Sequence, residues 1–210
     1  MIIIGAGGFA VELLQVLQDL EEQEDIFFYD DITPEVPNTL FGEFNVLKSE
    51  KQATELFATS SKRFVLGLGN PTYRELLARK LTTYGGKLVS AVSPYASIGT
   101  QNVFIGQGTC ILSGVRISNN TIIGKGCLIY YNSVVTHDCK LGDWIEISPG
   151  VNILGRVEIG NHTTVGSGST ILPNIKIGRN VIIGAGSVVT KNIPDNSLVY
   201  GVPAKIKKYV

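Results

Sequence analysis

An aliphatic residue recurs at every sixth position through the second half of this chain, and this period constrains the fold more than any other feature. Fifteen successive positions at this spacing hold Ile, Leu or Val, and the residue four places after each is always small or β-branched. A helix repeats every ~3.6 residues and a strand every ~2, so neither explains the pattern. Short strands joined by tight turns do, with three hexapeptides to each triangular coil. The aliphatic positions are Ile105, Ile111, Ile117, Ile123, Ile129, Val135, Leu141, Ile147, Ile153, Ile159, Val165, Ile171, Ile177, Ile183 and Val189.

Fifteen hexapeptides predict five full coils of a parallel β-helix, with the aliphatic side chains inside. Val92 and Ile98 keep the same period before one inserted residue and predict a starting coil. The composition follows from this geometry: 24 of 210 residues are Gly and only 17% are charged, because two of every six positions must be aliphatic or small and the corners favour Gly.

The charge balance excludes some partners. The chain has 18 basic and 18 acidic residues, so no basic excess is present to bind nucleic acid or an anionic membrane. No apolar run approaches the ~18 residues of a membrane span. Three Cys without paired spacing predict no disulfide framework, and Met1-Ile2-Ile3-Ile4 lacks the features of a signal peptide. We therefore expect a soluble cytoplasmic protein.

The first 86 residues have a different pattern, in which expected strands alternate with expected helices. Strands are predicted at Met1–Ile4, Ile26–Tyr29 and Phe64–Leu68, and helices over Val11–Leu20 and from Asn70-Pro71 to Gly85-Gly86. This alternation predicts a small parallel sheet. We expect an α/β domain, half of a Rossmann fold, over residues 1–86 and the β-helix with a C-terminal tail over residues 87–210.

A glycine-rich loop follows the first expected strand. Residues 5–10 read Gly-Ala-Gly-Gly-Phe-Ala, and Asp30 and Asp31 follow about twenty residues later, which matches a dinucleotide-binding fingerprint. About 85 residues provide only one mononucleotide-binding half, so NAD binding is disfavoured. A single anionic ligand could bind this loop, and purely structural turns are the alternative. The residues expected at the carboxyl ends of the three strands are Gly7, Gly8, Asp30, Asp31, Gly69 and Asn70.

His137 and Asp138 form the clearest candidate for chemistry. They fall at a predicted corner of the β-helix, where side chains project outward. A neutral imidazole accepts protons well near pH 7, and a carboxylate on its other nitrogen fixes the tautomer. The alternative is a solvated His with an acidic neighbour by chance. We interpret the other histidine, His162, as a surface corner without a catalytic role, and Trp144 as a subunit contact.

The cysteines do not add a nucleophile. Cys127 and Cys139 occupy small inward positions of the repeat, so we interpret them as packing residues, and Cys110 lies one position later. No paired base is expected beside any of them. Two His also fall short of the three ligands of a zinc carbonic anhydrase, so no metal site is predicted.

Six motifs, in this order, resemble one family. They are Ile3-Ile4-Gly5-Ala6-Gly7-Gly8, Tyr29-Asp30-Asp31, Leu68-Gly69-Asn70, Val135-Thr136-His137-Asp138-Cys139, Ile147-Ser148-Pro149-Gly150 and Gly201-Val202-Pro203-Ala204-Lys205. The chain is similar to hexapeptide-repeat sugar acetyltransferases of the sialic acid O-acetyltransferase and bacillosamine-pathway type (NeuD/PglD). The resemblance implies a left-handed β-helix, acetyl-CoA as co-substrate, no metal, and a homotrimer with active sites between subunits.

The resemblance also implies roles for individual residues. His137 would be the general base, Asp138 its orienting partner, and the Gly155 backbone N–H the oxyanion donor. Acetyl-CoA would contact Glu146, Gly155, Ser167 and Ala185, with Lys191 or Lys205 near its phosphates. The acceptor would bind the glycine-rich loop, Phe9 included, with Asp30, Asp31, Gly69 and Asn70.

Two positions depart from the family pattern. Glu146 stands where the family commonly has a second His that contacts the acyl-CoA, and Phe9 stands where some relatives have a His near the sugar. A carboxylate accepts hydrogen bonds only and repels the CoA phosphates at long range, so the role of that second His does not carry over to Glu146. The alternatives are that Glu146 binds a water or the pantetheine amides, or that CoA is placed slightly differently in this subfamily.

We expect N-acetylation of a nucleotide-linked amino sugar, for polysaccharide or glycan biosynthesis. O-acetylation of a sialic acid or related sugar is the closest alternative, because it needs the same base and thioester. A non-catalytic β-helix that binds nucleotide sugars is the alternative of another class, and the His137-Asp138 pair argues against it. An NAD-linked oxidoreductase would need a second nucleotide-binding half.

Overall fold

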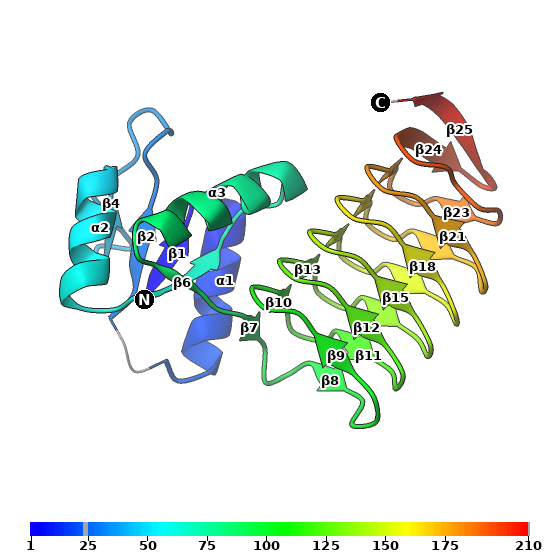
Figure 1. Cartoon of the computed structure of the whole chain (residues 1–210), viewed down its shortest axis with the longest axis horizontal. Coiled ribbons are helices and arrows are strands. Elements are labelled where there is room, and N and C mark those ends of the chain that lie inside the picture. Colours follow the sequence, from blue (N-terminus) through cyan, green and yellow to red (C-terminus); the bar gives the residue numbers. More distant parts are fainter. Residues whose placement is uncertain (23–24, 210) are drawn as a thin grey trace.

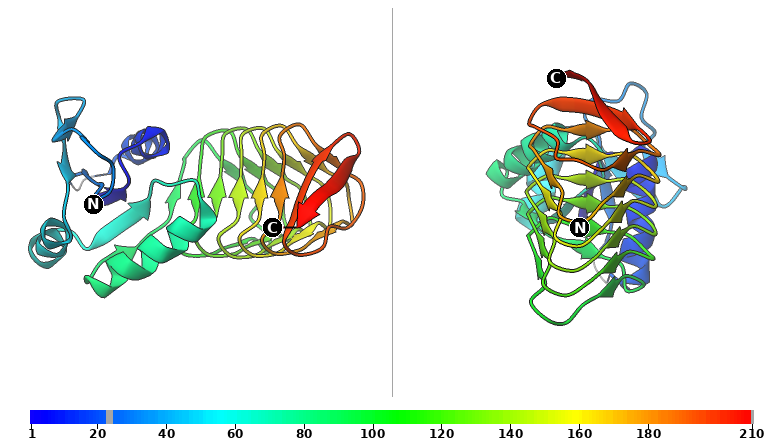
Figure 2. Two further views of the ribbon diagram at one scale, coloured as in Figure 1. Left: turned by 90° about the horizontal axis from the view of Figure 1, so that it is seen from above. Right: turned by 90° about the vertical axis from the view of Figure 1, so that its right-hand side faces the viewer.

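The protein has an α/β domain at one end and a stack of triangular coils that extends from it (Figure 1). The structure is a computed structural model and describes residues 1–22 and 25–209. Two further views show that the coils form a straight prism and that the last two strands cover its far end (Figure 2). The second predicted domain ends at residue 210, which lies outside the described residues.

The α/β domain is built on one sheet with the strand order β3-β4-β2-β1-β5-β6. All neighbours are parallel except β3 and β4, which form an antiparallel pair. The strands are β1 (Ile2–Ile4), β2 (Phe27–Tyr29), β3 (Thr39–Leu40), β4 (Phe44–Leu47), β5 (Arg63–Leu66) and β6 (Lys87–Leu88), and the helices are α1 (Gly8–Asp19), α2 (Glu50–Thr59) and α3 (Pro71–Thr83). The three predicted strands and two predicted helices are confirmed, and β3, β4, α2 and β6 are additional.

The apolar run in β1 is explained by burial on both faces of this sheet. Ile3 packs in one cluster with α1 residues such as Leu13, whereas Ile2 and Ile4 pack in another with Phe57 of α2. When both faces of a sheet are covered, the side chains on both sides of a strand are buried, so its sequence is continuously apolar. Strand β6 pairs with β5, so the sheet extends to Leu88, two residues beyond the predicted boundary.

The β-helix has three flat faces, each a ladder of two-residue strands, and face 1 ends in the longer strands β24 and β25. Face 1 contains β7 (Ala91–Val92), β10 (Cys110–Ile111), β13 (Leu128–Ile129), β16 (Glu146–Ile147), β19 (Thr164–Val165), β22 (Ile182–Ile183), β24 (Ser197–Gly201) and β25 (Ala204–Tyr209). Face 2 contains β8 (Ser97–Ile98), β11 (Arg116–Ile117), β14 (Val134–Val135), β17 (Asn152–Ile153), β20 (Thr170–Ile171) and β23 (Val188–Val189). Face 3 contains β9 (Phe104–Ile105), β12 (Ile122–Ile123), β15 (Lys140–Leu141), β18 (Glu158–Ile159) and β21 (Lys176–Ile177).

The six-residue period is confirmed from Ile105 to Val189. Strands on one face pair in parallel at a spacing of 18 residues there, as in Val134 with Asn152, so each of these coils consists of three hexapeptides. The starting coil has one additional residue, because Ala91 pairs with Cys110. The aliphatic positions line one continuous core. Small polar residues at the inner corners are also buried, and they are satisfied by the next coil: the Ser133 hydroxyl donates to the Ser148 carbonyl over 2.9 Å. Predicted packing residues Cys127 and Cys139 belong to this core.

The α/β domain is docked on the first coils. Helix α1 packs in one cluster with Cys110 and Leu128, which point outward from face 1. At the corner between face 3 and face 1, Trp144 is only 4% exposed and packs with the sheet, α2 and α3. The prediction that Trp144 makes a subunit contact was therefore wrong: its ring lies over Gly126 and against its own N-terminal domain.

Arg74 of α3 fixes the docking at the same corner. Its side chain is 1% exposed, and the guanidinium donates to the backbone carbonyls of Gly126, Trp144 and Ile145 on the β-helix. It also donates to the carbonyls of Leu68 and Gly69 in the loop before α3. These five bonds match the five N–H donors of a guanidinium, so the loop and the β-helix are held together by one side chain.

Candidate active site

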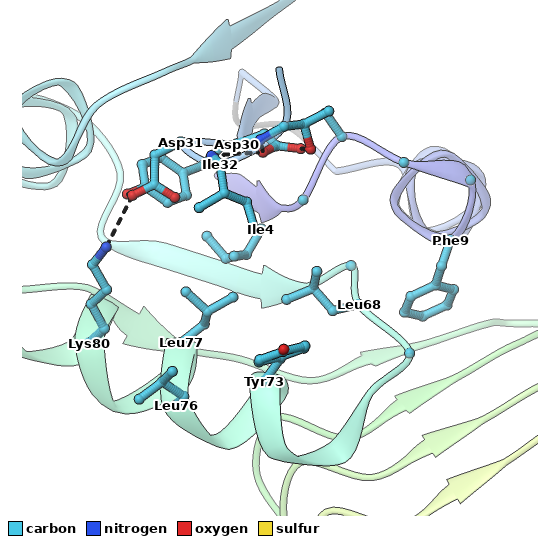
Figure 3. Close-up of a pocket in the computed structure, with 18 residues that line it drawn as sticks. Ile4, Phe9, Asp30, Asp31, Ile32, Leu68, Tyr73, Leu76, Leu77 and Lys80 are labelled. Carbon is cyan, nitrogen blue, oxygen red and sulfur yellow. Dashed lines mark hydrogen bonds and ion pairs between the residues drawn. The ribbon is translucent and has the colours of Figure 1, made fainter. Parts of the chain in front are cut away.

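The predicted ligand-binding residues of the N-terminal domain do come together, in a pocket of about 570 Å³. Gly7, Gly8 and Phe9 follow β1, Asp30 and Asp31 follow β2, and Gly69 follows β5, so the pocket lies at the carboxyl ends of three parallel strands, the usual ligand site of such sheets. Figure 3 shows the remaining wall: Tyr73, Leu76, Leu77 and Lys80 from α3 and Ile32 opposite.

Asn70 is the one predicted acceptor-binding residue outside this lining. Its side chain accepts a hydrogen bond from the Tyr73 backbone N–H at 3.1 Å and caps α3, with Pro71 at the first helical position. Asn70 lines a second, smaller cavity between α3 and the β-helix instead. The helix start predicted at Asn70-Pro71 is thus confirmed, and a contact between Asn70 and the acceptor stays a prediction.

The end of β5 packs closely against the start of α1 at the edge of the pocket. A Cβ at Gly67 would lie 2.8 Å from the Ala10 Cβ and 2.9 Å from the Ile4 carbonyl oxygen, so only Gly lets the end of β5 approach the start of α1 this closely. The sequence reading did not single out Gly67, although Gly at the end of a strand that faces a glycine-rich loop is a recognisable signal.

The two adjacent aspartates have different environments. Asp30 is 9% exposed, and its carboxylate accepts hydrogen bonds from the backbone N–H groups of Ile32 and Thr33 and from the Thr33 hydroxyl. Its carboxylate therefore shapes the 30–33 turn. The Asp31 carboxylate instead accepts hydrogen bonds through Oδ2 from the Tyr29 hydroxyl at 2.7 Å and the Lys80 ammonium at 3.0 Å, as Figure 3 shows for Lys80.

These contacts lower the pKa of the Asp31 carboxyl. Burial raises that pKa, but the hydrogen bonds from Tyr29 and Lys80 outweigh the effect of burial. Lys80 also pairs with Glu50 of α2 at 2.8 Å, and the hydrogen bond to Glu50 is the main cause of its own raised pKa. Asp31 is therefore ionised near neutral pH, and Lys80 places a cation on the wall of the pocket.

His137 and Asp138 lie at the corner between faces 2 and 3, and both are exposed. The His137 Nδ1 is 2.6 Å from Asp138 Oδ2. An ionised carboxylate only accepts hydrogen bonds, so in the neutral imidazole Nδ1 carries the proton and the lone pair is on Nε2. The hydrogen bond from His137 is the main cause of the lowered pKa of the Asp138 carboxyl. This is the arrangement that a general base needs.

Gly155 lies directly beneath the imidazole. It follows His137 by 18 residues, one coil further along the same corner, and the next backbone N–H, of Arg156, donates to the His137 carbonyl at 3.1 Å. A Cβ at Gly155 would come within 2.7 Å of the ring. Within residues 1–22 and 25–209, no hydrogen bond uses the Gly155 N–H, so this donor is available next to the proposed base.

The predicted CoA-binding positions are spread over several parts of the β-helix, and Gly155 lies at the His137 corner described above. Ser167 and Ala185 occupy one corner of consecutive coils, between faces 1 and 2, and both are exposed. Glu146 lies on the flat of face 1, beside Gly69 of the N-terminal pocket. Lys191 and Lys205 are exposed near the far end. These contacts stay predictions.

His162 is less isolated than expected. It stands at a corner of the β-helix, as predicted, but its Nε2 lies 2.8 Å from Glu75 Oε2 of α3. Its side chain is 25% exposed and lines the second cavity together with Asn70. His162 therefore joins the two domains, which the sequence pattern alone did not indicate.

The base and the pocket are separated within one chain. His137 lies between β14 and β15, whereas the α/β domain is docked around the corner between β15 and β16, at the other end of face 3. Accordingly, none of the residues that line the pocket comes from the His137 corner. Among the described residues, no group of three or more His, Cys, Asp or Glu is arranged to hold a metal ion, and no helix is long and apolar enough to cross a membrane.

A β-helix of hexapeptide repeats with an outward His–Asp pair fits an acyltransferase, and the similar proteins show this class. The comparisons agree: residues 120–155 and 156–191 match the bacterial transferase hexapeptide family, and residues 1–81 match the PglD N-terminal domain family. GDP-perosamine N-acetyltransferase of Escherichia coli O157:H7 is 31% identical over 163 residues, covering 74% of this chain and 70% of that protein.

Two solved structures extend the likeness over the whole chain. A histidine-to-asparagine mutant of perosamine N-acetyltransferase from Caulobacter crescentus, in complex with CoA and GDP-perosamine, superposes with a TM-score of 0.90 at 31% identity and covers 99% of this chain and 96% of that one. The acetyltransferase domain of PglB from Neisseria gonorrhoeae FA1090, in complex with acetyl coenzyme A, has a TM-score of 0.87 at 26% identity and covers 98% of both chains.

The chain belongs to the NeuD/PglD-type sugar acetyltransferases, which join a PglD N-terminal domain to hexapeptide repeats. The family and the fold class expected from the sequence, a half-Rossmann α/β domain followed by a left-handed β-helix, are confirmed.

Proposed function

We propose that this protein transfers the acetyl group of acetyl-CoA to the amine of a nucleotide-linked amino sugar. The observation that carries the proposal is the His137 corner, where Nε2 has a lone pair and the Gly155 N–H is available beside it. Similar proteins support the substrate class, because they bind CoA together with GDP-perosamine or acetyl coenzyme A. The nucleotide would occupy the N-terminal pocket.

The reaction balances with these groups alone. The neutral amine attacks the thioester carbonyl, so a carbon–nitrogen bond forms while the carbon–sulfur bond breaks. His137 Nε2 takes the proton from the attacking nitrogen, and that proton ends on the CoA sulfur. The Gly155 N–H would stabilise the oxyanion of the intermediate, which is commonly a large contribution to such rates. Asp138 holds the imidazole in the reactive tautomer.

The separation of base and pocket supports a homotrimer with active sites between subunits. The pocket of one chain holds the nucleotide, and His137 of a neighbouring chain would reach the sugar. Ser167 and Ala185 lie on exposed backbone along one corner, which suits CoA bound in a groove between neighbouring β-helices. A cytoplasmic location, where acetyl-CoA is available, is part of the same proposal.

An acceptor panel tests this proposal. Purified protein is mixed with acetyl-CoA and with UDP-, dTDP- and GDP-linked amino sugars and sialic acids, and the release of CoA thiol is followed. We expect turnover with a nucleotide amino sugar. Turnover confined to sialic acid would replace N-acetylation by O-acetylation, and no turnover or CoA binding would favour a non-catalytic scaffold.

A further inference from the structure

Glu146 occupies the boundary between the covered and the open part of face 1. The residues that point outward from this face are in register, from Ala91 through Cys110, Leu128 and Glu146 to Ile182. The α/β domain buries the first three, each 2% exposed or less, whereas Ile182 is 44% exposed. Glu146 is half-buried between them, so its carboxylate lies at the edge of the docked domain.

This edge is also the end of the nucleotide pocket. A methyl group at Gly69 would lie 3.6 Å from Glu146 Oε1, and Gly69 lines the pocket. Phe9, which also lines the pocket, contacts Tyr130 of the β-helix with ring centroids 5.1 Å apart. In Figure 3 the Phe9 side chain extends from α1 toward the loop after Leu68. Two lining residues of the pocket therefore adjoin face 1: Gly69 lies beside Glu146, and Phe9 lies beside Tyr130.

The Glu146 carboxylate has no hydrogen-bond donor within the part of the chain that the structure describes. The nearest cation is Arg74, but all five of its hydrogen bonds go to backbone carbonyls. Burial raises the pKa of the Glu146 carboxyl, and the charge of Arg74 only partly opposes this. Among the described residues no fully buried side-chain oxygen lacks a partner, so the Glu146 oxygens still reach solvent and water is their donor in the free protein. A ligand that brings N–H groups or a positive charge would replace that water with a charge-assisted hydrogen bond, which is stronger than one between neutral groups.

We infer that Glu146 binds the amino group of the acceptor sugar. This inference rests on the proposed function, since an amino sugar attached to a nucleotide in the pocket extends past Gly69 toward this carboxylate. It reassigns Glu146 from the acetyl-CoA contacts to the acceptor. A carboxylate is poorly suited to the phosphate-bearing CoA, whereas it accepts hydrogen bonds from both an ammonium and a neutral amine.

Binding by Glu146 also favours release of the product. An ammonium carries three N–H donors and a positive charge, whereas the acetamido product carries one N–H and no charge. Of the two protons lost, one ends on the CoA sulfur and the other in solvent. The carboxylate therefore binds the substrate more tightly than the product. Glu146 also selects amines over hydroxyl acceptors, because only the amine brings a charge.

The test is a Glu146→Gln variant, with Glu158→Gln as the matched control. Glu158 begins β18 as Glu146 begins β16, but it pairs with Lys176 at 3.2 Å on face 3. Steady-state kinetics are measured with acetyl-CoA and GDP-perosamine, or whichever panel amino sugar the wild type acetylates fastest. We expect the KM of the amino sugar to rise by about tenfold to hundredfold in Glu146→Gln, with the KM of acetyl-CoA within about twofold and the control unchanged.

An unchanged KM for the amino sugar, or a rise confined to acetyl-CoA, would overturn the inference. A second measurement uses the wild type alone: calorimetry should show that the amino sugar binds at least about tenfold more tightly than the nucleotide sugar with a hydroxyl in place of the amine. Equal binding of the two would also overturn it. If the wild type acetylates no nucleotide amino sugar, the proposed function itself is wrong. This outcome differs from an active enzyme whose KM for the amino sugar does not depend on Glu146, so the two failures can be told apart.

Discussion

The His137 imidazole lies against Gly155, so that a Cβ at this glycine would be 2.7 Å from the ring Cε1 and 2.8 Å from Nε2. Gly155→Ala should therefore push the imidazole away from its position. Because the clash is with the end of a side chain that can move, we expect kcat to fall by at least about tenfold while stability changes little.

The control for this variant is Gly85→Ala. Gly85 has a φ of +92° after α3, so a Cβ there is strained although nothing lies near it. That variant should lose roughly 1 kcal/mol of stability and keep its kcat. A wild-type kcat for Gly155→Ala would show that the ring does not need its place over Gly155.

Arg74→Met should weaken the junction of the two domains. It would leave the backbone carbonyls of Gly126 and Trp144 without a donor, and a buried acceptor without a partner costs ~1–3 kcal/mol. The Ile145 carbonyl would keep the hydrogen bond from the Leu128 N–H at 2.9 Å. We expect a lower midpoint of denaturant unfolding and a higher KM for the nucleotide sugar, because Arg74 also holds the Gly69 carbonyl of the pocket.

Arg79→Met is the matched control on the same helix, since Arg79 is 77% exposed and pairs with Glu75 on the surface of α3. Its stability should stay within about 0.5 kcal/mol of the wild type. Equal effects of the two substitutions would contradict the role given to Arg74.

The period of six was enough to predict the β-helix because each aliphatic position has the same surroundings in every coil. The pocket was predictable for a related reason: glycines and aspartates directly after expected strands must meet at one edge of a parallel sheet. Between residues 32 and 63 no such pattern exists. Helix α2 buries only Ala53 and Phe57, so this helix and the neighbouring β3 and β4 were missed.

Contacts between the domains could not be predicted from local pattern. Trp144 has a φ of +58° at a corner that would be exposed in an isolated β-helix, and only the docked domain buries it. Arg74 did leave a signal. It precedes Ala78 by four residues and Leu81 by seven, which places it on the buried face of α3, and a basic residue there requires several buried acceptors.

Lys80→Met should reduce stability in a pH-dependent way. Although burial raises the pKa of the Asp31 carboxyl, the hydrogen bonds from Tyr29 and Lys80 lower this pKa overall. The ionised Asp31 therefore stabilises the folded state at pH values above the pKa of the unfolded chain, and this stabilisation is lost as the pH falls. The pKa of Lys80 is raised, chiefly by the hydrogen bond to Glu50, so the stabilisation by the Lys80 ammonium is lost only at strongly alkaline pH.

The midpoint of denaturant unfolding should therefore differ most between Lys80→Met and the wild type from about pH 5 to 10, and the difference should shrink below about pH 4. Lys51→Met, which removes an 84% exposed ammonium from a surface pair, should show no such dependence. A constant difference from pH 3 to 8 would contradict the Lys80–Asp31 interaction.

Complementation between subunits tests where the active site lies. Gly7→Trp should fill the mouth of the pocket, since nothing lies within 4 Å of a Cβ at Gly7, and His137→Asn should remove the base. Each variant alone should be inactive. If pocket and base come from neighbouring chains of a trimer, mixed and reassembled protein should recover about a quarter of the wild-type activity. A mixture without activity would place both parts in one chain.

The central claim, that His137 is the general base of an acetyl transfer, is tested most directly by the rate of CoA release in His137→Asn with a nucleotide amino sugar. His162→Asn is the control, because His162 pairs with Glu75 between the domains and should affect stability rather than catalysis. We predict that kcat falls at least ~10²-fold in His137→Asn, with the unfolding midpoint unchanged and the control near the wild-type kcat. A His137→Asn protein that turns over at the wild-type rate would contradict the mechanism.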